Sequence, residues 1–194
     1  IKIGVLGDIG SGKSFVAKQF GSPVFDADKE VGLIYSSDRF CYKKIKKKFP
    51  DFIKAKKIQK NELGKVIKAN KKNLKIISDI VHPLVRKRMN IFLKKNSRKK
   101  MVVLDIPLLV ENKLYDKRFY LIFIQSRKNE INKRLKKRPF YNKSIINSLR
   151  KSQKSLVYKK KISHFVIKNN FKLLSIKKDI KIIKKKILDE RNSS

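Results

Sequence analysis

The chain has 194 residues, a hydrophobic fraction of 41% and a formal net charge of +38. This length suits one α/β unit with an insertion, and the apolar share is enough for a buried core. No run reaches the roughly 18 apolar residues of a membrane span. The first six residues lack the pattern of a secretory signal, and the single cysteine excludes an internal disulfide. We therefore expect a cytoplasmic protein without membrane contact.

The positive charge comes mainly from lysines that are spread along the whole chain. Lysine runs such as 46–48, 159–161 and 184–186 are far apart in the sequence. A nucleic-acid binder usually concentrates its basic residues on one face, with aromatic residues between them. We therefore predict solvated lysine faces and no specific nucleic-acid partner.

The first 28 residues predict a strand, a glycine-rich turn, a helix and a second strand. Residues 1–6 form an apolar run, and a helical spacing of apolar residues follows the turn and ends at Gly21. Residues 24–25 are the second strand, which is followed by two carboxylates, Asp26 and Asp28.

Helical patterns dominate the next 70 or so residues, which predict an insertion with little strand structure. One helix of this insertion is expected to open at His82 and Pro83, because proline is favoured in the first helical turn. Its apolar face would contain Val85, Met89 and Phe92.

The remaining third of the chain alternates strand and helix patterns. Residues 101–106 and 119–124 are continuous apolar runs, as in central strands of a parallel sheet. A helix with Ile131 and Leu135 follows, and residues 165–167 predict a last strand. A C-terminal helix is predicted from isoleucines at helical spacing, which would form its apolar face: Ile176, Ile180, Ile183 and Ile187.

These elements predict an α/β fold with a doubly wound parallel sheet. The core would comprise residues 1–28, 101–138 and 164–190. Residues 29–100 would form the helical insertion that binds a substrate. The basic, largely helical segment 139–163 would be a lid over bound phosphates.

The strongest motif is a Walker A phosphate loop, with Gly7, Gly12, Lys13 and Ser14 at the G-x-x-x-x-G-K-S/T spacing. It stands between a predicted strand and a predicted helix, as the motif requires. The glycines let backbone N–H groups turn toward phosphates, and the helix adds its positive N-terminus. Lys13 would bridge the β and γ phosphates and Ser14 would hold Mg²⁺, which makes this a P-loop enzyme that uses magnesium-ATP.

Carboxylates at strand ends are candidates for acid–base and metal chemistry. Asp28 is the best candidate for the base that takes the proton of an acceptor hydroxyl, and Asp26 for orienting a magnesium-bound water. The alternative is that both carboxylates cap the next helix. Asp105 suits a Walker B carboxylate, but it lacks the second acid that is common in ATPase motors, which disfavours a hydrolase.

Several cations lie in or after the helix that precedes the lid and could clamp phosphates bidentately. They are Arg127, Arg134, Arg138 and Arg150. In a chain this basic, each of them could instead be a surface charge. His82 is similarly open, because a histidine before proline can be a structural cap rather than a ligand or base.

The ordered motifs resemble the dephospho-CoA kinase family, whose enzymes phosphorylate the ribose 3′-hydroxyl of dephospho-CoA. The resemblance spans nearly the whole chain. It rests on Gly7–Ser14, Asp26-Ala27-Asp28, His82-Pro83-Leu84-Val85, the Asp105–Glu111 run Asp-Ile-Pro-Leu-Leu-Val-Glu, and Gln153 with Val166-Ile167-Lys168-Asn169.

The resemblance implies a role for each of these segments. Asp28, Lys13 and Arg134 would be catalytic, and Ser14 and Asp26 would hold Mg²⁺. Asn169 would lie near the adenine of ATP. The remaining ATP-binding residues would be Gly10, Ser11, Gly12, Phe15 and Arg138. Dephospho-CoA would be held by Asp28, His82, Arg88, Pro107, Leu108, Leu109 and Glu111.

The chain departs from the family pattern at three places. Asp8 stands where the family usually has Gly, Phe15 replaces the usual Thr, and Ser163-His164 replaces a common Ala-Asp pair. Asp8 would weaken ATP binding by repulsion unless its side chain points outward, where lysines would offset its charge.

Three functions remain in competition. The leading hypothesis is phosphoryl transfer from ATP to dephospho-CoA, by a monomer or weak homo-oligomer. A nucleoside monophosphate kinase would share the same strand, loop, helix and lid. A basic RNA-binding P-loop ATPase belongs to another class and is motivated only by the charge.

Overall fold

The computed structural model describes residues 1–137 and 141–192. The chain divides into two compact units, one of Ile1–Asp26 with Arg98–Ser194 and one of Ala27–Ser97. The sequence predicted the insertion at 29–100. No helix in the described part of the chain is long and apolar enough to cross a membrane.

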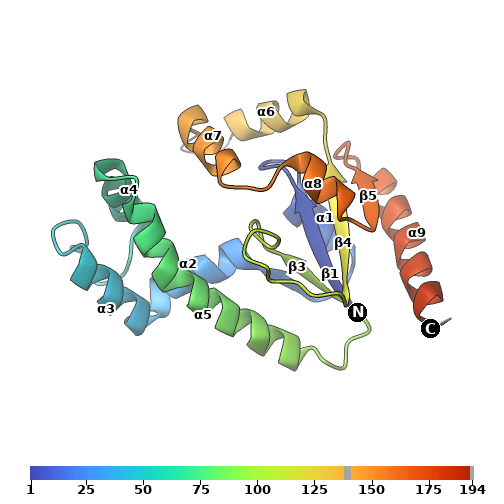
Figure 1. The fold of residues 1–194 in the computed structure, drawn as a ribbon, viewed down its shortest axis with the longest axis horizontal. Coiled ribbons are helices and arrows are strands. Elements are labelled where there is room, and N and C mark those ends of the chain that lie inside the picture. Colours follow the sequence, from blue (N-terminus) through green and yellow to red (C-terminus); the bar gives the residue numbers. More distant parts are fainter. Residues whose placement is uncertain (138–140, 193–194) are drawn as a thin grey trace. The chain divides into compact units, whose positions relative to one another are not determined.

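The first unit is built on a parallel sheet (Figure 1). Its strands in the described residues are β1 (Lys2–Gly7), β2 (Val24–Asp26), β3 (Val102–Asp105), β4 (Phe119–Gln125) and β5 (Phe165–Lys168). Their order across the sheet is β2-β3-β1-β4-β5, and every pairing is parallel. The apolar runs at β3 and β4 are internal strands beside β1, as predicted, because both of their faces are covered.

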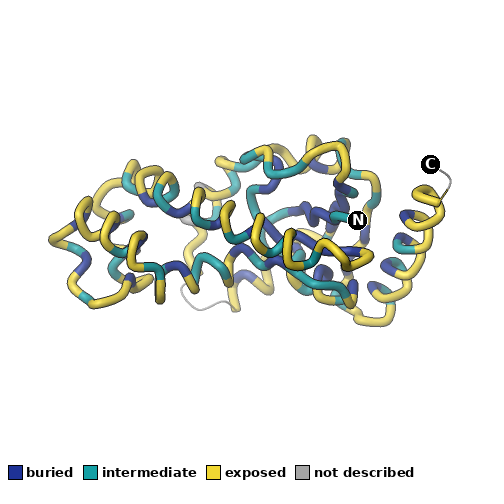
Figure 2. Tube along the Cα trace, turned by 90° about the horizontal axis from the view of Figure 1, so that it is seen from below, coloured by how far each residue is buried: buried dark blue, intermediate teal, exposed yellow. Residues whose placement is uncertain are grey.

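One face of the sheet is covered by α1 (Lys13–Gln19) and α9 (Leu173–Asn192). Ile3 and Val5 of β1 pack there against Val16 and Ala17 of α1 in one buried cluster. The predicted apolar face of α9 is confirmed, since the four isoleucines assigned to that face, at positions 176, 180, 183 and 187, all join this cluster. Figure 2 shows the turns of α9 near the C label alternating between buried and exposed.

Glycine at position 4 allows close packing on the opposite face. A Cβ on Gly4 would lie 2.5 Å from Leu109 Cδ2 and 2.9 Å from Leu121 Cδ2. Helix α8 (Leu156–Lys161) also packs on β1. The sequence grouped this helix with the lid, but here it belongs to a layer of the sheet. The helices α6 (Lys128–Lys136) and α7 (Lys143–Lys151) precede it.

The second unit is helical, and its described elements are α2 (Ala27–Ser37), α3 (Arg39–Lys48), α4 (Lys60–Ala69) and α5 (Asn73–Lys95). The long helix α5 packs against each of the other three. The core of this helical unit contains fully buried side chains from its other three helices, Ile34, Ile45 and Val66.

The prediction that a helix opens at His82 and Pro83 is wrong, because α5 begins at Asn73 and carries Pro83 in its interior. Proline in a helix interior removes one hydrogen bond and costs about 3 kcal/mol. The helix continues because Ile77, Val81, Val85 and Met89 are buried on both sides of the proline. Tertiary packing of this apolar face outweighs the local penalty.

Candidate functional site

The phosphate loop connects the end of β1 to the start of α1, and its shape depends on two glycines. Gly10 and Gly12 have φ angles of 85° and 87°, in the left-handed region that glycine adopts readily. A Cβ on Gly10 would lie 2.9 Å from Leu135 Cγ, and one on Gly12 only 2.4 Å from Asn169 Nδ2. Both positions therefore exclude a side chain for conformational and for steric reasons.

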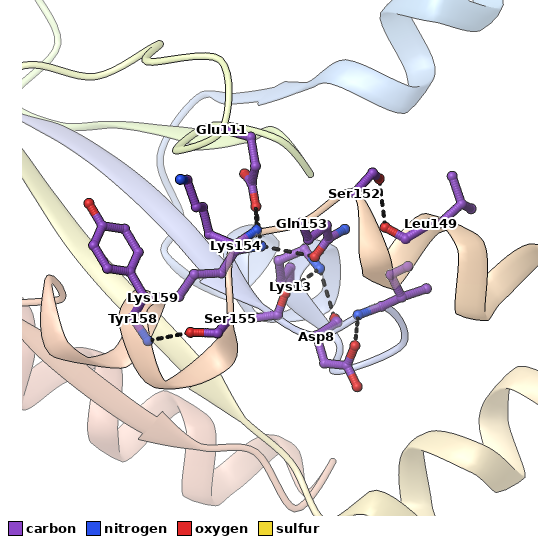
Figure 3. Close-up of polar contacts among 12 residues, drawn as sticks. Asp8, Lys13, Glu111, Leu149, Ser152, Gln153, Lys154, Ser155, Tyr158 and Lys159 are labelled. Atoms are coloured by element: carbon purple, nitrogen blue, oxygen red, sulfur yellow. Dashed lines mark hydrogen bonds and ion pairs between the residues drawn. The ribbon is translucent and has the colours of Figure 1, made fainter. Parts of the chain in front are cut away.

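Lys13 folds back across this loop. Its Nζ donates to the carbonyl oxygen of Asp8 at 2.9 Å and to that of Gly7 at 3.3 Å, as Figure 3 shows for Asp8. The ammonium group thus lies beside the N-terminus of α1, where backbone N–H groups and the helix dipole favour an anion. Ser14 is exposed in the first turn of α1, so its hydroxyl is accessible. The loop therefore has the features of a polyphosphate site.

The loop backbone is braced from β4 and β5. The carbonyl oxygen of Ser11 accepts hydrogen bonds from Asn169 Nδ2 and from Ser126 Oγ, both at 2.8 Å. Asn169 is 3% exposed, and its Oδ1 accepts from the Phe171 N–H at 2.8 Å. Both ends of this amide are thus bound to backbone groups. The structure gives Asn169 a bracing role, and its position near adenine remains a prediction.

Arg134 lies over an aromatic ring near Gly12. Its guanidinium carbon is 4.0 Å from the centroid of the Phe171 ring, a cation–π contact. The same ring lies against Gly12, because a Cβ there would be 2.8 Å from Phe171 Cε1. Arg134 is therefore close to the loop, as its predicted phosphate contact requires. The other predicted ATP ligand of this segment, Arg138, lies outside the described residues.

The extra carboxylate of the loop, Asp8, has a specific partner in α7. Arg150 Nε donates to Asp8 Oδ1 at 3.0 Å, and Arg150 Nη2 donates to Asp8 Oδ2 at 2.8 Å. The sequence predicted that lysines would offset the charge of Asp8 if its side chain pointed outward. The structure shows instead that one arginine binds both carboxylate oxygens. Of the four arginines considered, Arg150 is thus bound to the loop itself rather than being a plain surface charge.

Two carboxylates meet at the carboxyl edge of the sheet, next to the strand that leads into the loop. Asp26 and Asp105 are register partners at the ends of β2 and β3. Asp105 is 4% exposed. In the described residues, no group of three or more His, Cys, Asp or Glu could hold a metal. One or two carboxylates, a hydroxyl and substrate phosphates are nevertheless the donor set that Mg²⁺ usually takes, so Ser14, Asp26 and Asp105 fit this ion.

Asp28 and the predicted acceptor ligands His82 and Arg88 belong to the helical unit. Asp28 is exposed in the first turn of α2, two residues after Asp26. An acid in this turn also complements the helix dipole, so the capping alternative stays open. His82 is an exposed residue in the middle of α5, and partial desolvation lowers its pKa. Arg88 Nη1 binds Glu30 Oε2 at 3.0 Å, which ties α5 to α2.

The segment after β3 contains the other predicted acceptor ligands. Pro107 and Leu108 are half-buried, while Leu109 is fully buried beneath Gly4 and is a core side chain. Only one carboxylate oxygen of Glu111, Oε1, makes polar contacts among the described residues. The other oxygen, Oε2, is buried without a hydrogen-bond partner there.

The contacts of Glu111 Oε1 reveal a buried lysine that sequence reasoning missed. This oxygen lies 2.9 Å from Lys159 Nζ and accepts from the Lys154 N–H at 2.8 Å. Lys159 Nζ also donates to Gln153 Oε1 at 2.9 Å, and Lys159 is only 1% exposed. Figure 3 shows these side chains beside the phosphate loop. The prediction that the run 159–161 is solvated is therefore wrong for Lys159.

Comparisons with known proteins agree with this architecture. The dephospho-CoA kinase family model matches residues 1–175. A dephospho-CoA kinase of Wolbachia pipientis wMel is 34% identical over 170 residues, which cover 85% of this chain and 87% of that protein. The solved structure of TT1252 from Thermus thermophilus has a TM-score of 0.75 at 25% identity, and covers 98% of this chain and 97% of that one.

A second solved structure supports the fold. The dephospho-CoA kinase from Campylobacter jejuni has a TM-score of 0.64 at 24% identity, with 96% of each chain covered. The family match includes the phosphate loop, both strand-end carboxylates and the Asn169 brace in one continuous stretch. This chain therefore belongs to the dephospho-CoA kinase family.

Proposed function

We propose that this chain transfers the γ-phosphoryl group of ATP to the ribose 3′-hydroxyl of dephospho-CoA, which yields CoA and ADP. The observation that supports this most is the phosphate loop, with Lys13 folded over it, in a chain that matches the family over residues 1–175. ATP and dephospho-CoA are the substrates that membership in this family implies.

In the proposed reaction the bond between the γ-phosphorus and the β,γ-bridging oxygen breaks as the bond to the 3′-oxygen forms. Asp28 takes the proton of the hydroxyl, so the attacking oxygen gains electron density as it reacts. Lys13, Arg134 and the amides of the loop stabilise the negative charge on the phosphates. Asp28 lies in the first turn of α2, two residues after the end of β2, and is exposed, as a base that must reach a substrate has to be.

Mg²⁺ is proposed as the metal that accompanies ATP. Ser14, Asp26 and Asp105 would hold it, directly or through water, and the ion would neutralise charge on the β and γ phosphates. All three side chains supply hard oxygen donors from the first unit, Ser14 in the first turn of α1 and the two aspartates at the ends of β2 and β3.

Substrate identity is tested by incubating the chain with magnesium-ATP and dephospho-CoA and measuring the products by mass spectrometry. We expect one added phosphate on dephospho-CoA and an equal amount of ADP. Nucleoside monophosphates offered in parallel test the second kinase hypothesis. Transfer to a nucleoside monophosphate but not to dephospho-CoA would refute the proposal.

The role of Asp28 is tested by Asp28→Asn, which keeps the shape of the side chain but removes its basicity. We expect kcat to fall by about 10²-fold or more while the Kd for ATP stays nearly constant. Asp51→Asn is a matched control, because Asp51 is an exposed aspartate of the same unit outside the proposed site. Normal turnover of Asp28→Asn would remove Asp28 from the mechanism.

Three further expectations rest on the sequence. These are a cytoplasmic location, a monomer or weak homo-oligomer, and the absence of a specific nucleic-acid partner. RNA binding that collapses at moderate salt and leaves phosphoryl transfer unchanged would be the behaviour of a generally basic surface. Stimulation of ATP hydrolysis by RNA would instead favour the RNA-binding ATPase.

A further inference from the structure

Asp8 and Arg150 form an ion pair between the phosphate loop and α7, across 142 positions of the sequence. Two nitrogens of the guanidinium group bind the two carboxylate oxygens, at 3.0 and 2.8 Å. This bidentate arrangement is among the stronger and more directional hydrogen-bonded ion pairs. The side chain of Asp8 is 15% exposed and that of Arg150 is 29% exposed. Solvent and salt therefore screen the pair less than they would a surface pair.

Asp8 cannot easily be withdrawn from the loop, because its other polar atoms are part of the loop structure. Its carbonyl oxygen accepts from Lys13 Nζ at 2.9 Å and from the Ser11 N–H at 3.1 Å. Its Oδ1 also accepts from the Ile9 N–H at 2.7 Å. The carboxylate is therefore held in place in the loop that must accept the phosphates of ATP.

A fixed carboxylate repels a bound polyphosphate. It also reduces the positive electrostatic potential that the nearby ammonium group of Lys13 provides for the phosphates. A loop that carries this charge needs a cation at the same place. The guanidinium of Arg150 supplies such a cation, because it contacts both oxygens of the Asp8 carboxylate. A lysine would supply only a point charge, whereas the planar guanidinium matches the geometry of the carboxylate.

We propose that Arg150 is the charge-compensating partner of Asp8, and that a phosphate loop carrying the Asp8 carboxylate binds ATP with full affinity only while Arg150 pairs with it. This inference rests on the proposed use of ATP. It makes Arg150 a positioning residue that acts through Asp8, rather than a ligand of the phosphates. The pair also fixes α7 next to the phosphate loop.

The alternative role for Arg150 is direct binding of phosphates, with Asp8 holding the guanidinium until ATP arrives. The two roles predict opposite results for a double variant. If Arg150 only compensates Asp8, removing both charges restores ATP affinity. If Arg150 binds phosphates itself, the double variant remains as weak as Arg150→Ala.

The test compares the Kd of magnesium-ATP, measured by isothermal titration calorimetry, for Arg150→Ala, Asp8→Asn and the double variant. We expect Arg150→Ala to weaken ATP binding about tenfold or more, because the partly buried charge of Asp8 loses its partner beside the bound phosphates. Asp8→Asn should bind ATP at least as tightly as the unaltered chain, and the double variant should lie within about threefold of Asp8→Asn. Lys151→Ala, which removes the adjacent exposed cation of α7, is the matched control and should leave the Kd within about twofold.

Two results would overturn the inference. One is an ATP affinity of Arg150→Ala that equals that of Lys151→Ala, and the other is a double variant as weak as Arg150→Ala. Circular dichroism verifies that each variant is folded. Arg150→Lys is a milder second variant, whose loss of ATP affinity should lie between that of Lys151→Ala and that of Arg150→Ala. These outcomes do not depend on whether dephospho-CoA is the phosphoryl acceptor, since ATP affinity is measured in its absence. A chain that binds ATP but does not phosphorylate dephospho-CoA would refute the proposed function and leave this comparison decisive.

Discussion

Substitution of Gly12 by alanine tests how tightly the phosphate loop is packed against its brace. The new methyl group would lie 2.4 Å from Asn169 Nδ2 and 2.8 Å from Phe171 Cε1. Neither neighbour can yield freely, because Asn169 is 3% exposed and bonded to Ser11 O, and the Phe171 ring is covered by Arg134. We therefore expect both backbone strain and a disrupted brace.

The magnitude follows from two contributions. A non-glycine residue at φ +87° costs about 1 kcal/mol of conformational energy. Displacing the Asn169 amide from its buried carbonyl partner costs a further ~1–3 kcal/mol. The sum is about 2–4 kcal/mol. For a chain of this size, each kcal/mol lowers the Tm by about 2–4 °C, so we expect a decrease of roughly 4–16 °C.

Gly21→Ala is the matched control for this experiment. Gly21 also has a positive φ, at 60°, but its new methyl group would meet nothing within 4 Å. It should therefore show the conformational cost alone, about 1 kcal/mol or 2–4 °C. Thermal unfolding followed by far-UV circular dichroism measures both variants. Equal Tm decreases for the two variants would refute the argument that the Asn169 brace restricts position 12.

The remaining predictions concern buried ionisable groups in each unit. Burial raises the pKa of the Cys41 thiol to about 11, and the nearby Asp38 adds to the shift. We expect Cys41 to resist iodoacetamide at pH 8 until the helical unit unfolds, and its stabilising effect to be present below pH 9 and lost between pH 9 and 11. Rapid labelling of the native chain would contradict this. Lys159→Met leaves the carboxylate of Glu111 without its buried cation, and should lower the unfolding free energy by about 3–5 kcal/mol in urea titrations. Adding Glu111→Gln should recover part of that loss, and no recovery would show that packing rather than charge is responsible.

Sequence patterns were sufficient wherever a feature depends on neighbouring residues. The strand, phosphate loop and helix at the start of the chain were predicted correctly because the glycine spacing and the apolar runs are local signals. The buried face of α9 was equally predictable, because an amphipathic helix repeats its apolar residues at a regular interval. The parallel direction of the strands followed from the alternation of strands and helices.

Local rules failed where distant packing outweighs them. Pro83 was expected at the start of a helix, since its local preference favours the first turn, yet it lies inside α5. The apolar residues before and after it are buried by the other helices of the unit. Lys159 was expected in solvent, yet its ammonium group pairs with Glu111 inside the first unit. In both cases the deciding contacts come from segments that are remote in the sequence.

The sequence by itself determined the fold class, the phosphate loop and the order of the family motifs, because each of these is encoded in short stretches of chain. Only the tertiary structure decided which side chains meet at that loop. Asn169 reaches Ser11 and Arg150 reaches Asp8 across more than a hundred residues. The physical reason is that a hydrogen bond or an ion pair depends on distance and direction in space, and these are set when the strands of the parallel sheet bring their carboxyl ends to one edge.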